Sequence, residues 1–296
     1  MIKLTTVTKK FGQTTAINNI NLDIKENGIY CLIGRNGAGK STLMSLIAGY
    51  SGATAGEVVI DGKRVSPSRR PEIVNCIGVS APPDLSEGQI ARIAVEVSNH
   101  FNMKVGDLIS TAAKLQDNFD YDFALETAER FELDLNKKYN HLSFGMKVML
   151  TTIMALANNS KIIMLDEPTL GFDAVMRGKF NEMLLESYAA NPRIIIVSTH
   201  LIDEMAKVAE RFIIIEKGRI IAEAATEEID EKAYTLTGAS DLVLPLIQQN
   251  NLNCISKTTA GNITAAHIYD RRITPPEGIS VSRMGLQDFF INLIND

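Results

Sequence analysis

The 296-residue sequence lacks tryptophan altogether, and aromatic residues make up only 6% of it. Proteins that bind single-stranded nucleic acid stack the bases on aromatic rings, and nucleic-acid-binding domains in general present a basic face. The net charge here is −5. The composition therefore argues against a nucleic-acid partner.

Cysteines and long apolar runs are also scarce. Cys31, Cys76 and Cys254 form no C-x-x-C pair, which favours reduced thiols in a cytosol over disulfides or a zinc site. No apolar stretch reaches the roughly 18 residues that a membrane-spanning helix needs, and the first residues do not resemble a signal peptide. We therefore expect a chain that is soluble by itself, so that any role at a membrane needs a separate partner chain.

The most specific pattern in the sequence is GRNGAGKST at residues 34–42. It matches G-x-x-x-x-G-K-[ST], a loop whose glycines bring backbone N–H groups close to phosphate oxygens. The apolar run 29–33 predicts a strand before it, and residues 42–48 predict a helix after it, whose N-terminus favours an anion. Lys40 can reach the β and γ phosphates, and Ser41 can bind Mg²⁺. An ordinary glycine-rich turn does not need this Lys-Ser pair, so the sequence predicts a nucleoside triphosphate ligand.

Two carboxylates follow a second apolar run, in KIIMLDEP at residues 161–168. Asp166 and Glu167 stand at the C-terminal end of this predicted strand, the edge at which open α/β sheets place their active sites. One carboxylate can support a metal ion, and the next can orient or deprotonate an attacking water. An acidic strand end that merely faces solvent is the alternative, and the phosphate loop upstream disfavours it.

Two further segments carry polar residues that could meet a phosphate. HLSFGMK, residues 141–147, places Ser143 as a helix N-cap, so that Ser143 and the Gly145 backbone can face an anion. Taken alone, this segment fits a capped amphipathic helix better. IIIVSTH, residues 194–200, ends a buried strand at His200, a position that a structural histidine also fits.

The hydrophobic periodicity predicts an α/β fold. Nearly continuous apolar runs at 162–165, 194–197 and 212–215 alternate with helical patterns at 174–190 and 203–210. This alternation indicates a parallel sheet that helices cover on both faces.

Other segments flank this core. Strands separated by turns are predicted before the phosphate loop, and a helical insert is predicted at about 86–158. The acidic stretch AEAATEEIDEK, residues 222–232, suits a connector. Beyond it we expect a small α+β appendage, with a strand at 232–237, a helix at 242–247, a hairpin over 255–269 and a closing helix at 286–294.

Taken in order, the motifs resemble the nucleotide-binding domain of ATP-binding cassette (ABC) proteins over about residues 1–221. GRNGAGKST resembles the Walker A motif, KIIMLDEP the Walker B motif with its glutamate, LSFGM the signature LSGGQ, TLGFD the D-loop and STH the H-loop. The resemblance implies a P-loop NTPase cassette with a parallel core sheet, an antiparallel β-subdomain and a helical insert. Residues 222–296 would then form a C-terminal accessory or dimerisation subdomain.

The resemblance also implies a role for each motif residue. Two cassettes, identical or different, would bind ATP and Mg²⁺ between them. The residues that would take part fall into four groups by the part of the ligand that they contact. Adenine would stack on Phe11; the phosphates would contact Gly34, Asn36, Gly37, Ala38, Gly39, Lys40, Ser41 and Thr42, and Ser143 and Gly145 of the second subunit; Mg²⁺ would be held by Ser41 and Asp166; catalysis would use Glu167 and His200.

A membrane partner is implied as well. In this family an integral-membrane transporter subunit binds the cassette at the cytoplasmic face of the cell membrane, here against residues 81–85 and the predicted helix 86–101. LSFGM and the short appendage most resemble a Gram-positive exporter subgroup for drugs, peptides or amphipathic toxins, which includes phenol-soluble modulin exporters. The function expected from this resemblance is ATP hydrolysis that powers efflux.

The sequence departs from the family pattern at three places. Phe144 and Met146 replace signature residues, Phe172 replaces the usual D-loop leucine, and no glutamine follows the strand 77–80 until Gln89. These departures leave open a regulatory ATP-binding subunit of a heterodimer. A soluble ABC ATPase of translation or DNA repair is another alternative, which the single cassette and the short spacing between Walker A and the signature disfavour.

Overall fold

The computed structural model describes residues 1–68, 102–116 and 118–294, together with the backbone of residues 77–80. The strands are β1 Ile2–Phe11, β2 Thr14–Ile24, β3 Gly28–Ile33, β4 Ala55–Ile60, β5 Lys63–Arg64, β6 Ile77–Ser80, β7 Ile162–Asp166, β8 Ile194–Thr199, β9 Arg211–Glu216, β10 Arg219–Ala225, β11 Ala233–Ala239, β12 Cys254–Ala260, β13 Ile263–Tyr269 and β14 Ile279–Arg283. Within the described residues they form three sheets, with the orders β2-β1-β4-β5, β10-β9-β3-β8-β7-β6 and β12-β13-β11-β14.

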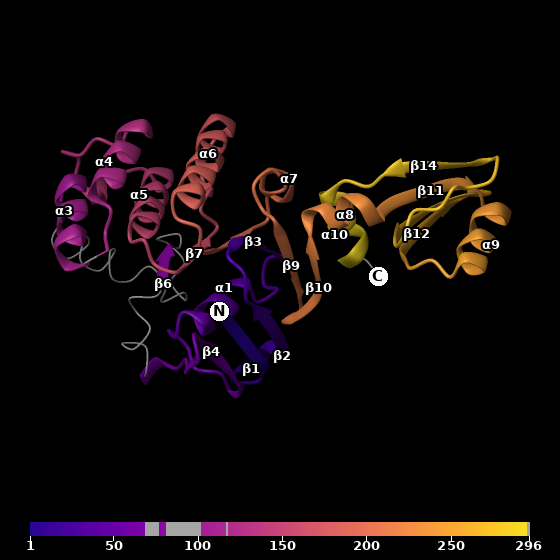
Figure 1. The fold of residues 1–296 in the computed structure, drawn as a ribbon, viewed down its shortest axis with the longest axis horizontal. Helices are drawn as coiled ribbons and strands as arrows, with labels where there is room; N and C mark the ends of the chain where they lie inside the picture. The colour runs from indigo at the N-terminus through magenta and orange to yellow at the C-terminus, as the bar shows by residue number, and fades with distance from the viewer. Residues whose placement is uncertain (69–76, 81–101, 117, 295–296) are drawn as a thin grey trace.

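The helices of the described residues lie on the two faces of the six-stranded sheet, at one end of the molecule and in the C-terminal part (Figure 1). They are α1 Lys40–Ile47, α3 Val105–Leu115, α4 Tyr121–Arg130, the 3₁₀ helix η4 Tyr139–His141, α5 Phe144–Ala157, α6 Ala174–Ala190, α7 Ile202–Met205, α8 Thr226–Lys232, α9 Ser240–Asn250 and α10 Leu286–Ile294.

The six-stranded sheet is parallel except at one edge. Strand β3 pairs in parallel with β8 and β9, and β7 pairs in parallel with β8 and β6, whereas β10 is antiparallel to β9. Every residue of β3, β7 and β8 is buried, because both faces of these strands are covered, as their unbroken apolar sequences predicted. The predicted parallel core sheet and antiparallel β-subdomain are thus confirmed.

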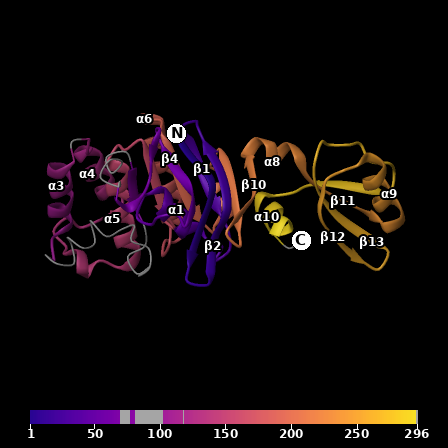
Figure 2. The ribbon, with the colours of Figure 1, turned by 90° about the horizontal axis from the view of Figure 1, so that it is seen from below.

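Two apolar cores cover the two faces of this sheet. One joins β1, β2 and β4 to α1 and to alternate residues of the central strands. In the other core, the helices α3, α4, α5, α6 and α7 pack against the opposite face of the same strands. Figure 2 shows the resulting order of parts, with α3 and α4 at one end, the sheets in the middle and the third sheet at the other end.

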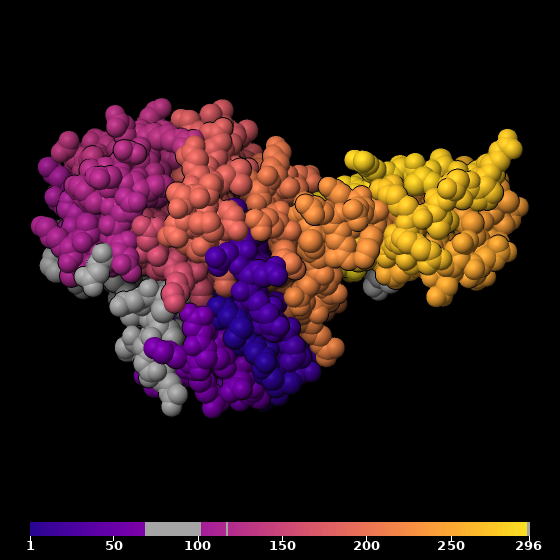
Figure 3. Space-filling view, viewed as in Figure 1, coloured from indigo at the N-terminus to yellow at the C-terminus, as the bar shows by residue number. Residues whose placement is uncertain are grey.

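The C-terminal lobe follows the predicted order closely. Strand β11, helix α9 with Pro245 inside it, the β12–β13 hairpin and α10 all form. Helix α9 packs against β11 and β13 over a small separate core around Tyr234. Figure 3 shows this lobe projecting from the side of the cassette.

The last helix ties this lobe to the rest of the chain. Phe289 of α10 is fully buried in the same apolar core as Phe212 of β9. Its ring centroid lies 4.9 Å from that of Tyr269 on β13, and α10 also contacts α7. Phe289 therefore packs on the cassette of its own chain.

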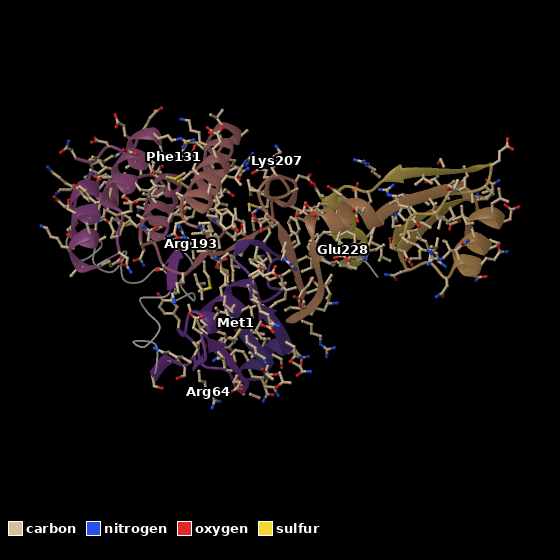
Figure 4. All side chains as sticks on the ribbon, in the orientation of Figure 1. Met1, Arg64, Phe131, Arg193, Lys207 and Glu228 are labelled. Carbon is tan, nitrogen blue, oxygen red and sulfur yellow. The ribbon has the colours of Figure 1, made fainter. Side chains whose placement is uncertain are left out.

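Two sequence predictions are wrong. Residues 222–232 are not a connector, because they complete β10 and form α8, with Ala224 and Ile229 buried. Two acidic residues in the first turn of α8 favour its helix dipole, and Lys232 bonds Glu228 at 2.7 Å, a pair spaced i,i+4. Figure 4 labels Glu228 at this junction. The predicted helix 203–210 is only one turn, α7, before the chain enters β9.

Candidate active site

The phosphate loop connects β3 to α1 and depends on the freedom of its glycines. Gly37 and Gly39 have φ of 81° and 110°, values that side chains strongly disfavour. A Cβ on Gly39 would also lie 2.8 Å from the Ala16 carbonyl oxygen. Glycine at this position therefore allows the loop to pass close to β2 and turn directly into α1 with Lys40 as its first residue.

The Lys40 side chain folds back onto the phosphate loop. Its ammonium donates a hydrogen bond of 2.8 Å to the Gly34 carbonyl, and only 7% of the residue is exposed. Ser41 and Thr42 follow it in the first turn of α1, Ala38 is buried, and Asn36 is exposed. The sequence prediction placed all of these residues at a phosphate, and the structure gathers them at one end of α1.

Strand register brings the other motifs to this edge. Ile33 of β3 pairs with Thr199 of β8, and Ser198 of β8 pairs with Asp166 of β7. The phosphate loop, the Walker B carboxylates and the H-loop therefore begin at the same level of three adjacent parallel strands. This is the carboxyl edge at which open α/β sheets bind ligands.

Glu167 is the point at which these motifs meet. His200 Nδ1 lies 2.9 Å from Glu167 Oε2, and Lys40 Nζ lies 3.8 Å from Glu167 Oε1. The backbone N–H of Glu167 donates to the Ser198 carbonyl at 2.9 Å. Glu167 has φ of 47°, a left-handed conformation that is uncommon outside glycine and that clusters at functional sites.

Asp166 is almost completely buried, with 2% of its surface exposed. Its carboxylate accepts a hydrogen bond from the Ser198 hydroxyl, so its orientation is fixed by the neighbouring strand. The hydroxyl of Ser41 and the carboxylate of Asp166 are hard oxygen donors of the kind that Mg²⁺ binds together with substrate phosphates. Within the described residues, no group of three or more His, Cys, Asp or Glu side chains forms a separate metal cluster.

Ser198 is a residue that sequence reasoning missed. It stands inside the STH segment, where only His200 was singled out, yet it supports both Asp166 through its side chain and Glu167 through its backbone. A hydroxyl residue at the end of an otherwise apolar buried strand was the available signal, since a buried polar group needs a partner.

The signature residues belong to a different element, the N-terminus of α5, from the phosphate loop of the same chain. The Ser143 hydroxyl accepts from the Met146 N–H at 3.3 Å and caps α5, as predicted. Gly145 lies in the first turn of α5, close to Gly171 of the D-loop segment. None of the hydrogen bonds of the described residues joins Ser143 to the phosphate loop.

Phe11 is the last residue of β1, and 55% of it is exposed. The ammonium of Lys9 lies 4.8 Å from the centroid of its ring. More than half of Phe11 is thus accessible to a ligand, with the Lys9 ammonium over the ring. Several residues named in the sequence analysis lie outside the described residues: the expected membrane-subunit contact at 81–85, the predicted helix 86–101, Gln89 and Cys76.

Comparison with known proteins decides the family. The family model described as ABC transporter matches residues 17–170. The chain belongs to the ABC transporter family. The lantibiotic transport ATP-binding protein SrtF of Streptococcus pyogenes is 30% identical over 225 residues, covering 75% of this chain and 90% of that protein. The Nod factor export ATP-binding protein I of Burkholderia orbicola is 31% identical over 230 residues, covering 76% and 71%.

Solved structures agree with this assignment. A dimeric ATP-binding cassette in a post-hydrolysis state, bound to ADP and Pi, superposes with a TM-score of 0.59 at 28% identity, covering 76% of this chain and 99% of that one. An ATP-binding subunit of an ABC transporter gives a TM-score of 0.64 at 22% identity, covering 77% and 91%. The fold is therefore the ABC cassette, and the chain is an ABC ATPase, the ATP-binding subunit of a transporter.

Proposed function

We propose that this ABC ATPase powers export through a separate integral-membrane subunit at the cytoplasmic face of the cell membrane. Of the two relatives described above, one is named for lantibiotic transport and the other for Nod factor export. Relatives named for xylose/arabinose import and spermidine/putrescine import are less similar, at 27% and 26% identity. Within the described residues, no helix has the length and apolarity needed to cross a bilayer, which is consistent with a separate membrane chain.

The cargo class in this proposal is a peptide, a drug or an amphipathic toxin, as in the Gram-positive exporter type. The lantibiotic relative supports a peptide cargo, because a lantibiotic is itself a peptide. The LSFGM signature and the short C-terminal appendage are the features of this chain that support the narrower assignment. A phenol-soluble modulin is one cargo within this class.

The observation that carries the proposed activity is the convergence of Lys40, His200 and Glu167 at the carboxyl edge of the sheet. Glu167 would hold and deprotonate the water that attacks the γ-phosphate, since a positioned carboxylate can serve as general base. His200, bonded to Glu167, would orient that carboxylate and contact the γ-phosphate. Lys40 would bind the β and γ phosphates.

The remaining predicted residues complete the proposed ATP site. Mg²⁺, held by Ser41 and Asp166, would neutralise the charge of the phosphates. Phe11 would stack on adenine, and backbone N–H groups of residues 34–42 would surround the phosphates. Ser143 and Gly145 would close on the γ-phosphate from a second subunit, because in their own chain they lie on a different element from the phosphate loop.

We also propose a functional division at residue 221. Residues 1–221 would form the catalytic cassette, including the helical insert about 86–158, and residues 222–296 an accessory subdomain that supports dimerisation. Strand β10 crosses this boundary, so the two parts would move together. The second subunit in the dimer would be another copy of this chain or a related cassette.

Phosphate release by the purified chain with ATP and Mg²⁺ tests this proposal. We expect steady hydrolysis that depends on chain concentration, because two cassettes are needed for each complete site. A regulatory, non-hydrolysing subunit is the second candidate, which the replaced signature residues Phe144 and Met146 favour. ATP binding without phosphate release, restored by adding a second cassette, would support that candidate instead.

A further inference from the structure

The two aromatic departures from the family pattern lie beside the same pair of neighbouring glycines, Gly145 and Gly171. Phe144 begins α5 immediately after Ser143, and Phe172 lies in the D-loop segment after β7. The two residues are 28 positions apart in the sequence. The family pattern has glycine at the position of Phe144 and leucine at the position of Phe172. The intervening strand β7 returns the chain to the N-terminus of α5, so the two segments lie side by side.

Each phenylalanine packs against a glycine of the other segment. A Cβ built on Gly171 would lie 3.2 Å from Phe144 Cδ1, and one built on Gly145 would lie 3.6 Å from Phe172 Cδ1. Each ring therefore lies beside the glycine of the other segment. The backbones also approach closely, since the same built atom on Gly171 lies 3.5 Å from Gly145 Cα. We name these four residues, Phe144, Gly145, Gly171 and Phe172, the aromatic clamp.

The D-loop side of the clamp is anchored in the fold. Phe172 is 8% exposed and belongs to the main apolar core, and Phe144 packs against that core from its edge. The Phe172 carbonyl accepts from Arg177 Nη1 at 3.3 Å, and Arg177 forms an ion pair with Glu204 of α7, with 2.7 Å between Nε and Oε1. Helix α7 begins two residues after His200. The clamp is thus joined to the segment that carries the H-loop.

We propose that Phe144 is a positioning residue that holds the signature end of α5 against the D-loop of its own chain. The inference rests on the proposed function, in which Ser143 and Gly145 meet ATP held by a second subunit. With glycine at position 144, the helix end would lack this contact. With phenylalanine, the first turn of α5 and the D-loop move as one body. Precise placement matters here, because an error of about 1 Å in a reacting geometry can cost about a hundredfold in rate.

The test compares Phe144→Ala with the conservative Phe144→Leu and with Phe123→Ala as a matched control. Phe123 is also a half-buried phenylalanine packed against the same core, on α4. We expect Phe144→Ala to lower kcat for ATP hydrolysis by at least about fivefold and Phe144→Leu to recover most of that loss. Binding of ADP to the isolated subunit should not change, because the phosphate loop is untouched. Phe123→Ala should lower the thermal midpoint and leave kcat unchanged.

A double-mutant cycle with Phe172→Leu identifies the contact itself. If the two rings act as a unit, Phe144→Ala combined with Phe172→Leu lowers kcat no further than the worse single variant. Losses that multiply, or a Phe144→Ala enzyme at the wild-type rate, would overturn the clamp. Glu167→Gln, measured in parallel, separates the two hypotheses: if it abolishes turnover while Phe144→Ala does not reduce it, the proposed function stands and only the clamp fails.

Discussion

Replacing Glu167 by glutamine is the most direct perturbation of the proposed active site. The two side chains have the same shape, and the amide can still bond His200, which lies 2.9 Å from the present carboxylate. The change removes the negative charge and with it the general base. Since general-base catalysis contributes about 100- to 10,000-fold, we expect kcat to fall by that factor, equivalent to about 3–5 kcal/mol of transition-state stabilisation.

The same substitution has a separate effect on ATP binding. Lys40 lies 3.8 Å from Glu167, and both side chains are mostly buried. Desolvation offsets most of the attraction in a buried ion pair, so we expect the affinity for ATP to change by less than about tenfold. The direction should be toward tighter binding, because Lys40 loses a competitor for the phosphates.

Single-turnover phosphate release measures the chemical step, and nucleotide titration measures affinity. Size exclusion with ATP and Mg²⁺ should show a dimer that persists in the Glu167→Gln variant, because ATP is bound but not consumed. Glu182→Gln on the exposed face of α6 is the control and should hydrolyse ATP at the normal rate. Turnover of Glu167→Gln within about threefold of wild type would refute a general-base role, since that role predicts at least about a hundredfold.

Four other perturbations have expected outcomes. Phe11→Ala should weaken ATP binding by about 1 kcal/mol or more through lost stacking, with an unchanged thermal midpoint in the absence of ATP because the ring is 55% exposed; a lowered midpoint would indicate a core role instead. Arg193→Met should lower the free energy of unfolding by about 3 kcal/mol or more, measured by thermal or urea unfolding. Arg193, labelled in Figure 4, is only 3% exposed, and its guanidinium donates hydrogen bonds to carbonyls near the ends of α5 and α6. Phe289→Ala should cost about 3–5 kcal/mol in the same assay, whereas the exposed Ile291→Ala should not; equal midpoints would mean that α10 does not brace the cassette. Burial raises the pKa of the Cys31 thiol, so mass spectrometry should find it unalkylated in the native protein at mildly alkaline pH and modified after unfolding.

Much of the cassette could be predicted from the sequence because its central strands are buried on both faces. A continuous apolar run such as 194–197 is typical of a strand that is buried on both faces of a parallel sheet, and the glycines of the phosphate loop have few other uses at that spacing. The same local logic predicted the Ser143 cap, the β12–β13 hairpin and the bounds of α10. In each case the signal lies within a few adjacent residues.

Other features depended on neighbours distant in the chain. Residues 222–232 are acidic and poor in apolar side chains, yet they form β10 and α8 because β9 offers a pairing edge and the core accepts Ile229. Residues 203–210 have a helical pattern, yet the helix ends at Met205, and Arg211 begins a strand that pairs in parallel with β3. In both places tertiary contacts override the local preference of the sequence.

The sequence by itself determined the family, the order of the motifs and the identity of most candidate site residues, because a phosphate-binding loop needs particular residue types at fixed local spacing. Only the tertiary structure decided how those residues meet. The register of three parallel strands places Glu167 next to both Lys40 and His200. It also places the Ser198 hydroxyl where it donates a hydrogen bond to Asp166. The packing of α5 beside the segment after β7 brings Phe144 to Gly171, because contacts between distant segments follow from packing and not from spacing along the chain.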